Sequence, residues 1–214
     1  MKRLEPLSLW CLLASLTLLL TATTYRATLQ EESFIEYEAS DSNGIWQGRA
    51  PLETLELTFD SEALNELSLE ATLEPGKFDS GNRIRDANAR RGVFETGEYP
   101  LVTLTAQGVE AQGVEAGAAS LAVGETEQVS LVGTLMMHGV TREVRIPAEV
   151  SLENTNSGEV LRASGSFEVL LSDYDMDRPS FLGITVNDEV TVRFDVVGTL
   201  SETSAGGAGT GGTN

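Results

Sequence analysis

The residues best suited to acid–base chemistry are one histidine, His138, and the adjacent pair Arg85-Asp86. His138 is the only histidine, which excludes a zinc site built on several histidines, and a single cysteine, Cys11, excludes a thiolate cluster. A hydrolase or isomerase could use the three candidate side chains if they met at one place, although no nucleophile-elbow sequence accompanies them. Because His138 precedes Gly139 at a predicted turn, we favour a turn histidine that hydrogen-bonds to the backbone.

A second candidate site is the acidic run Asp173, Asp175 and Asp177. Its Asp-x-Asp-x-Asp spacing opens a calcium-binding loop, but the glycine and the distal glutamate of such a loop are missing. Arg178 and Pro179 follow instead. We therefore expect a solvated acidic loop and no metal site.

The stretch "FDSGNRIRDANARRGVF", residues 78–94, contains four arginines in a chain of net charge −19. That overall acidity argues against nucleic acid as a partner, because phosphate binding needs a concentrated basic face. Alanine and arginine favour a helix, Asp79 or Ser80 could cap its start, and cations suit its end. We predict a short helix in the 79–92 connection, with Ile84 and Phe94 burying one side of it.

Elsewhere the chain alternates apolar and polar residues with a period of two, which indicates strands with one buried face. The clearest runs cover residues 55–59, 67–73, 102–106, 129–137, 144–152, 161–169 and 190–196. With two more near the start, the pattern predicts an all-β fold of eight or nine strands. Short turn sequences between long strands favour an antiparallel up-and-down meander. A meander of this size either stacks into two sheets or closes into a barrel, and closure removes the exposed edge strands.

The inward face of this barrel would carry apolar groups and glycine, many of them small. Such a face fits either a tight core or an apolar cavity, and the pattern leaves both open. The predicted cavity-lining residues, if a cavity exists, are Leu57, Phe59, Leu69, Leu73, Phe78, Ile84, Phe94, Leu104, Leu131, Leu135, Met137, Ile146, Val150, Phe167, Val169 and Phe194.

The two ends differ from the barrel domain, which we assign to residues 29–200. Lys2 and Arg3 precede an uncharged apolar run over residues 7–22, so we interpret 1–28 as a signal peptide or an N-terminal anchor. An exported protein is expected, or a membrane-anchored one if the segment is not cleaved. Residues 201–214 form a Gly-rich tail that we expect to be disordered.

Three motifs, in the right order over residues 34–198, make the sequence similar to the YceI-like family of polyisoprenoid-binding proteins. The first motif comprises Asn82, Arg85-Asp86, Phe94 and Tyr99-Pro100, and the second comprises Gly133, Leu135 and His138 to Arg142. A third, weaker match is "SFEVLLSDYDMD" followed by "VNDEVTVRFDVVG". Within it the sequence departs from the family, since Leu170-Leu171 and Tyr174-Asp175 replace a basic residue and Phe-Gly.

The resemblance implies a lipocalin-like barrel of about eight strands. It also implies a bacterial protein that is periplasmic or secreted, or held at the inner membrane if the N-terminal segment is not cleaved. The barrel interior would hold an isoprenoid chain, from a quinone or a polyprenyl lipid, for transport, storage or stress protection. It implies no enzyme activity and no required cofactor, and it makes Arg83, Arg85, Asp86 and His138 head-group or structural residues. Two alternatives remain: an enzyme with Arg85, Asp86 and His138 at the barrel mouth, and a filled-barrel structural protein. Transient membrane contact and a homodimer are also left open.

Overall fold

The computed structural model describes residues 24–61, 63–111, 120–156 and 158–203. Ten strands make up one antiparallel sheet. They are β1 Thr24–Leu29, β2 Phe34–Asp41, β3 Gly44–Pro51, β4 Thr54–Asp60, β5 Ala63–Leu73, β6 Val102–Ala111, β7 Thr126–Met137, β8 Val140–Thr155, β9 Gly158–Leu170 and β12 Glu189–Thr203. The remaining elements are the 3-10 helices η1 Pro75–Lys77 and η2 Leu171–Tyr174, the helix α1 Arg83–Gly92, and the small hairpin β10 Ser180–Phe181 and β11 Ile184–Thr185.

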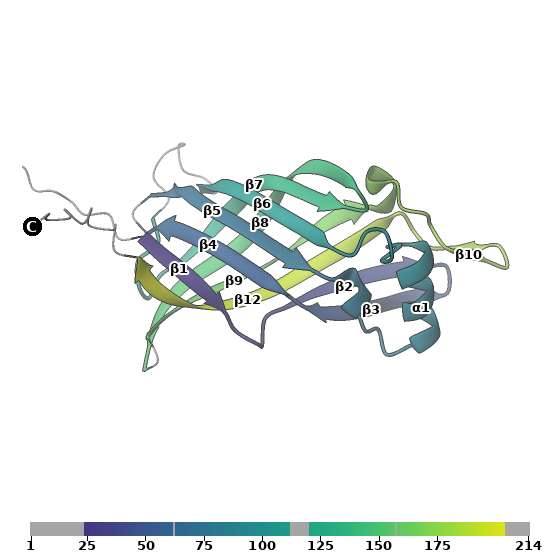
Figure 1. Cartoon of the computed structure of the whole chain (residues 1–214), viewed down its shortest axis with the longest axis horizontal. Coiled ribbons are helices and arrows are strands. Elements are labelled where there is room, and N and C mark those ends of the chain that lie inside the picture. Colours follow the sequence, from purple (N-terminus) through teal and green to yellow (C-terminus); the bar gives the residue numbers. More distant parts are fainter. Residues whose placement is uncertain (1–23, 62, 112–119, 157, 204–214) are drawn as a thin grey trace, which may run out of the picture.

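The sheet closes into a barrel of eight antiparallel strands, as the sequence predicted (Figure 1). The order runs from β1 through β4, β5, β6, β7, β8, β9 and β12, and β12 pairs again with β1. The last part of β12 pairs with β1 and its first part with β2, which in turn pairs with β3. β1 and β2 therefore act as one bent strand, and β3 and β4 as another.

The bend between β1 and β2 is held by one buried side chain, that of Ser33. Its hydroxyl donates to the carbonyl of Val197 on β12 at 3.2 Å and accepts from the Val197 N–H at 3.0 Å. The N–H of Gln30 also donates to the Val197 carbonyl, at 2.8 Å. These bonds satisfy backbone groups that the strand bend leaves without a ladder partner, so the wall stays closed where the strand is interrupted.

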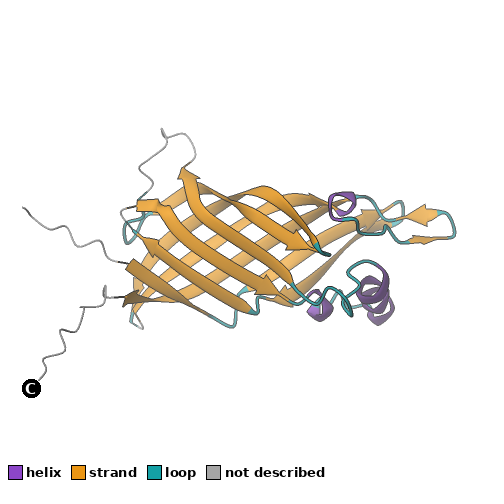
Figure 2. Ribbon diagram, turned by 45° about the horizontal axis from the view of Figure 1, so that its top comes forward, coloured by secondary structure: helices purple, strands orange, loops and turns teal. Residues whose placement is uncertain are grey.

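The arginine-rich connection contains the predicted helix, α1, at one end of the barrel, where η2 also lies (Figure 2). Its cap is Asn82, whose side chain accepts from the N–H groups of Ile84 and Arg85, and not Asp79 or Ser80 as expected. Asp79 instead exchanges two backbone hydrogen bonds of 3.0 Å with Arg49 on β3. That bridge fastens the connection to the barrel wall.

The prediction that Ile84 is buried on α1 is wrong, because its side chain is 75% exposed. Phe94, after the helix, does pack inward, and its ring stacks on Phe78 with centroids 5.8 Å apart. A helix this short has few faces to bury, and the buried position is Asp86, which faces the preceding loop. Ile84 is left largely exposed.

The barrel interior differs between its two ends. At the end away from α1, Tyr25 stacks on Phe59 with centroids 5.4 Å apart, and Leu121 and Leu152 are fully buried beside them. A second cluster of buried apolar residues lies toward α1 and η2. The first cluster fills its end of the barrel, whereas the second surrounds open space.

Both boundaries of the barrel domain extend beyond the predicted ones. β1 begins at Thr24, so residues 24–28, which sequence analysis assigned to the leader, pair with β12 and β4 in the barrel. β12 continues to Thr203, into the predicted tail. The rest of the predicted leader and tail, residues 1–23 and 204–214, lies outside the described residues. Within the described part of the chain, no helix has the length and apolar character needed to cross a membrane.

Candidate functional site

A cavity of about 850 Å³ occupies the barrel between the filled end and α1. This volume falls within the range of small-molecule sites. Within the described residues, Asp41 and Arg85 are the charged side chains on its wall, and the rest of the wall is mostly aliphatic and aromatic. Ile45 and Ile84 line the cavity and are also largely exposed, so the cavity opens to solvent at the α1 end.

We call this opening the mouth, and three segments form it. They are the β2–β3 turn with the start of β3 (residues 41–46), the N-cap and first seven residues of α1 (82–89), and the segment from Met176 to Val186 that carries the β10–β11 hairpin. Figure 1 shows α1 and the hairpin projecting at the same end of the barrel, opposite the end of β12. Segments distant in sequence thus surround one opening.

The cavity stays open partly because two large rings lie flat on glycines of neighbouring strands. Tyr37 on β2 pairs with Gly48 on β3, and Phe194 on β12 pairs with Gly165 on β9. A Cβ atom at Gly165 would lie 2.7 Å from the Phe194 ring, and one at Gly48 would collide with the Tyr37 ring. Each ring occupies the space that a side chain would take, and so it covers the wall without filling the lumen.

A β-bulge in β6 keeps that strand apolar toward the cavity along its length. Val102 and Leu104 line the cavity, and after a register shift between Ala106 and Val109 the lining residue is Val109. Gly108 lies in the bulge with φ +106°, a conformation that glycine adopts readily. The extra residue changes which sequence positions face inward.

All but one of the predicted lining residues line the cavity. Those that do are Leu57, Leu69, Leu73, Phe78, Ile84, Phe94, Leu104, Leu131, Leu135, Met137, Ile146, Val150, Phe167, Val169 and Phe194. Phe59 does not, because it stacks on Tyr25 in the filled end. Alternation identifies the inward face of a strand, but it does not say how far along the barrel the open space extends.

Sequence analysis missed several lining residues. Tyr37 and Ala39 line the cavity from β2, and their period of two would have identified them had the lining prediction been extended to that predicted strand. Met176 and Val186 line it from the segment after η2, which has no regular period. Nothing in the local sequence of that segment could have indicated their position.

At the mouth, Arg85 and Asp86 form a compact network with Ser80. The Asp86 carboxylate, 6% exposed, accepts from both the hydroxyl and the backbone N–H of Ser80. Arg85 donates through Nε to the Ser80 hydroxyl at 2.9 Å and through Nη2 to the Ser80 carbonyl at 3.0 Å. This network fixes the first turn of α1 to the preceding loop, and it holds the Arg85 guanidinium 5.4 Å from the ring centre of Trp46.

Tyr37 lies near this network and stays uncharged at neutral pH. Burial raises the pKa of its phenol, the negative charge of Asp86 raises that pKa further, and the Arg85 cation opposes both. The fourth predicted head-group residue, Arg83, is exposed and does not line the cavity. Of the four, Arg85 alone is on the cavity wall.

His138 belongs to a separate network at the turn between β7 and β8. Its Nδ1 is 3.2 Å from the Tyr174 carbonyl and its Nε2 is 3.0 Å from Glu95 Oε2, while its ring packs on Tyr99. Both polar partners are acceptors, so an imidazolium satisfies both at once and a neutral ring only one. Because Arg85 and Asp86 bond to Ser80, the described contacts do not unite the three candidate catalytic groups in one site.

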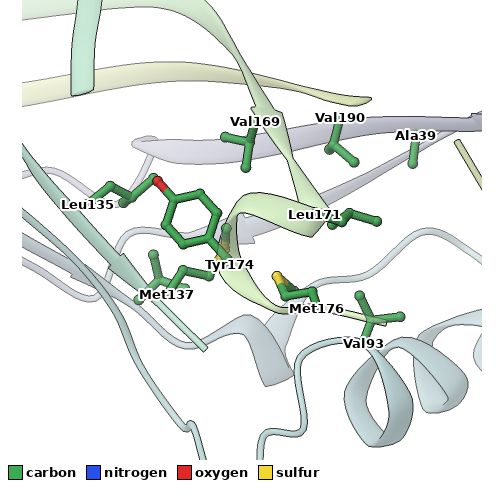
Figure 3. Close-up of a cluster of buried hydrophobic side chains, with 10 residues drawn as sticks. Ala39, Val93, Leu135, Met137, Val169, Leu171, Tyr174, Met176 and Val190 are labelled. Carbon is green, nitrogen blue, oxygen red and sulfur yellow. The ribbon is translucent and has the colours of Figure 1, made fainter. Parts of the chain in front are cut away.

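The second apolar cluster packs around η2 at the cavity end (Figure 3). Tyr174 lies beside Leu135 and Met137, and Met176 lies toward Val93 at the end of α1. Burial raises the pKa of the Tyr174 phenol, and the nearby Asp173 carboxylate adds to this. Tyr174 of η2 and Met176 after it thereby pack against β7 and the end of α1.

A carboxylate fastens η2 to the loop before β12. Asp188 accepts from the Ser172 N–H at 2.9 Å and from its hydroxyl at 2.6 Å, and these hydrogen bonds lower the pKa of Asp188. In the acidic run that follows, Asp173, Asp175 and Asp177 are exposed. The described residues contain no cluster of three or more histidine, cysteine or acidic side chains arranged to hold a metal ion.

Comparison with known proteins gave one family and several similar structures. A family model described as the YceI-like domain matches residues 28–198. A polyisoprenoid binding domain from Saccharophagus degradans is 17% identical, with a TM-score of 0.58, over 83% of this chain and 98% of that domain. BcnA from Burkholderia cenocepacia is also 17% identical, with a TM-score of 0.63, over 80% of this chain and 100% of that protein.

The YCEI protein of Campylobacter jejuni is 18% identical, with a TM-score of 0.51, over 71% of this chain and 81% of that one. None of the curated proteins matches the chain in sequence. At these identities the structural likeness shows the barrel fold alone. The evidence for the family is the match of the family model over residues 28–198.

Proposed function

Because the chain belongs to the YceI-like family, we propose that it is an exported lipid-binding protein. It holds one isoprenoid chain, the tail of a quinone or of a polyprenyl lipid, in the barrel cavity. Transport, storage or protection of that lipid under stress is its role. The description of a structural neighbour as a polyisoprenoid binding domain supports the choice of ligand class.

The single observation that carries the proposal is the cavity itself: about 850 Å³, with an apolar wall and one open end. A barrel filled by its own side chains, the structural alternative, would not contain this space. The enzyme alternative needs Arg85, Asp86 and His138 at one site, and their hydrogen bonds lead to different partners.

Burial of the chain alone provides enough free energy for binding. Each buried CH₂ group contributes about 0.8 kcal/mol, so one five-carbon isoprene unit contributes up to about 4 kcal/mol. Micromolar affinity needs only about 8 kcal/mol, although ordering the flexible chain offsets part of the gain. A few buried units therefore suffice, without any polar contact deep in the barrel.

The polar end of the ligand is expected at the mouth. Asn82, Asn88 and Arg85 line the cavity there and carry N–H donors, and Trp46 adds an aromatic face. Such groups suit a quinone carbonyl or a phosphate oxygen. The ligand would thus lie with its tail toward Tyr25 and Phe59 and its head beside α1.

Export belongs to the same proposal and rests on the N-terminal sequence, where two basic residues precede an uncharged apolar run. Separation of periplasmic, membrane and cytoplasmic fractions from the source cells tests it. Protein found in the cytoplasmic fraction would contradict export and leave lipid binding to be tested separately.

The direct test is mass spectrometry of organic extracts of the purified protein, followed by titration with a quinone while the fluorescence of Trp46 is followed. Two variants of neighbouring β8 residues control for nonspecific binding. Ala148 lines the cavity and Glu149 is exposed, so Ala148→Phe reduces binding whereas Glu149→Phe leaves it unchanged. Phospholipid or fatty acid as the extracted lipid, or equal binding by both variants, would refute the proposal.

A further inference from the structure

The mouth carries the most exposed large apolar side chains of the described residues. Ile45 is 70% exposed, Ile84 is 75% exposed and Leu182 is 85% exposed. They come from β3, α1 and the turn between β10 and β11, three segments that surround the cavity opening. One exposed apolar side chain needs no explanation, but three around one opening mark an interaction surface.

Leu182 in particular is not explained by the stability of the fold. It forms a two-residue hairpin turn with Gly183, and both residues have positive φ angles, 52° and 83°. Asparagine followed by glycine is the preferred pair in such a turn, and leucine is disfavoured there. A leucine exposed at the tip gains little packing to offset this cost, so its side chain is suited to entering an apolar medium.

The charge beside these side chains indicates the medium. Four of the ten residues of α1 are arginines, in a chain of net charge −19. Arg83, directly before Ile84, and Arg91, about two turns after it, are both exposed, and no ion pair engages them within the described residues. Apolar side chains flanked by cations suit the surface of a bilayer that contains anionic phospholipids.

We propose that the mouth is a docking face for an anionic lipid bilayer. Ile45, Ile84 and Leu182 enter the boundary between head groups and acyl chains, and Arg83 and Arg91 contact phosphates. The exposed acids Asp173, Asp175 and Asp177 near η2 oppose the contact, which keeps docking weak and reversible. The benefit of docking rests on the proposed function, since an isoprenoid could then pass between bilayer and cavity without crossing water.

Flotation of the full chain with vesicles that contain no isoprenoid tests this face. Vesicles of phosphatidylcholine with phosphatidylglycerol should bind the protein, with salt weakening the contact, and vesicles of phosphatidylcholine alone should bind it less. In the triple variant Ile45→Gln, Ile84→Gln, Leu182→Asn, partitioning should fall by about 100-fold, from the loss of three apolar side chains. Leu182→Asn alone is informative because asparagine suits the turn, so weaker docking cannot be attributed to misfolding.

The matched control is Val123→Gln. Val123 is also exposed, but it bridges to Leu152 at the filled end, so the variant should bind vesicles as the unaltered protein does. Equal binding by the triple variant, or no binding of the unaltered protein to either vesicle type, overturns the proposal. So does a triple variant that changes only the oligomeric state in sedimentation, because the face would then join copies of the chain.

Failure of the proposed function and failure of the docking proposal give different experimental results. Docking by a protein that extracts no isoprenoid would refute the ligand and keep the face, whereas an isoprenoid-loaded protein that ignores vesicles would refute the face alone.

Discussion

Single residues determine how much of the barrel is open. Gly48 has no side chain, and the Tyr37 ring occupies that position against the wall. The Tyr37 and Phe78 rings also pack in a T-shaped arrangement with centroids 5.0 Å apart, which keeps the Tyr37 ring from rotating freely. The space at the mouth therefore depends on one missing methyl group as much as on the apolar residues around it.

Adding that methyl should narrow the mouth. In Gly48→Ala the new Cβ displaces the Tyr37 ring into the cavity, at a stability cost of about 1–3 kcal/mol for the forced repacking. Quinone affinity should fall several-fold in the Trp46 titration, and Tyr37→Leu in the same chain should restore it. Gly97→Ala, where a Cβ meets nothing within 4 Å, should change neither property. Unaltered affinity in Gly48→Ala would show that the ring does not limit access.

At the scale of elements, the connection between β5 and β6 is fastened at several points. The Asp79–Arg49 bridge joins it to β3, the Asp86 network joins α1 to Ser80, and Arg90 donates to the Gly76 carbonyl at 2.9 Å. Four of these residues, Asp79, Ser80, Asp86 and Arg90, belong to the arginine-rich stretch 78–94. Their main visible effect is to hold α1 beside the mouth.

Removing the buried carboxylate should loosen this connection. Asp86→Ala leaves the Ser80 N–H and hydroxyl without their acceptor, which should cost about 1–3 kcal/mol of unfolding free energy. Denaturant unfolding measures the loss, and hydrogen exchange should show faster exchange over residues 80–92. Arg83→Ala removes an exposed side chain from the same helix and should leave both measurements unchanged. If the two variants behaved alike, the network would not be what holds α1.

The sequence predicted the elements better than their details. A period of two located the long strands. The period is strict there because a shift of one residue would turn every apolar side chain of the strand outward. It could not locate the bulge at Gly108, where the period itself breaks. The helix was expected from its composition, but its cap and the exposure of Ile84 depend on how the preceding loop folds back, which no local pattern records.

At the scale of the whole molecule, the barrel is closed at one end and open at the other. The stack of Tyr25 and Phe59 ends the cavity, and its wall includes β7 residues from Val129 to Met137, about 26 Å along the strand at 3.3 Å per residue. Alternation alone fitted both a hollow and a filled barrel, since opposing side chains from distant strands determine the remaining space. That distinction needed the assembled fold.

A cavity with a closed end should limit the length of the isoprenoid tail that it can bury. Affinity for quinones of increasing tail length should rise with each buried isoprene unit and then become constant once the tail reaches Phe59. Phe59→Leu removes part of the stop and should move the plateau to longer tails, although the lost packing also lowers stability. Titrations with a series of quinones provide the measurement. Affinity that rises without a plateau would show that the closed end is not a stop.

The pairing of β1 with β12 has a further consequence for the covalent chain. Thr24 and Thr203 are direct partners across this ladder, which closes the ring of strands. If β1 with β2 and β3 with β4 are counted as single bent strands, every other pair of neighbours in the ring is consecutive along the chain. A short linker could join the two residues, and the chain could be cut at another turn, giving a circular permutant with the same barrel. The ring of strands, and not the order in which they are synthesised, defines this fold.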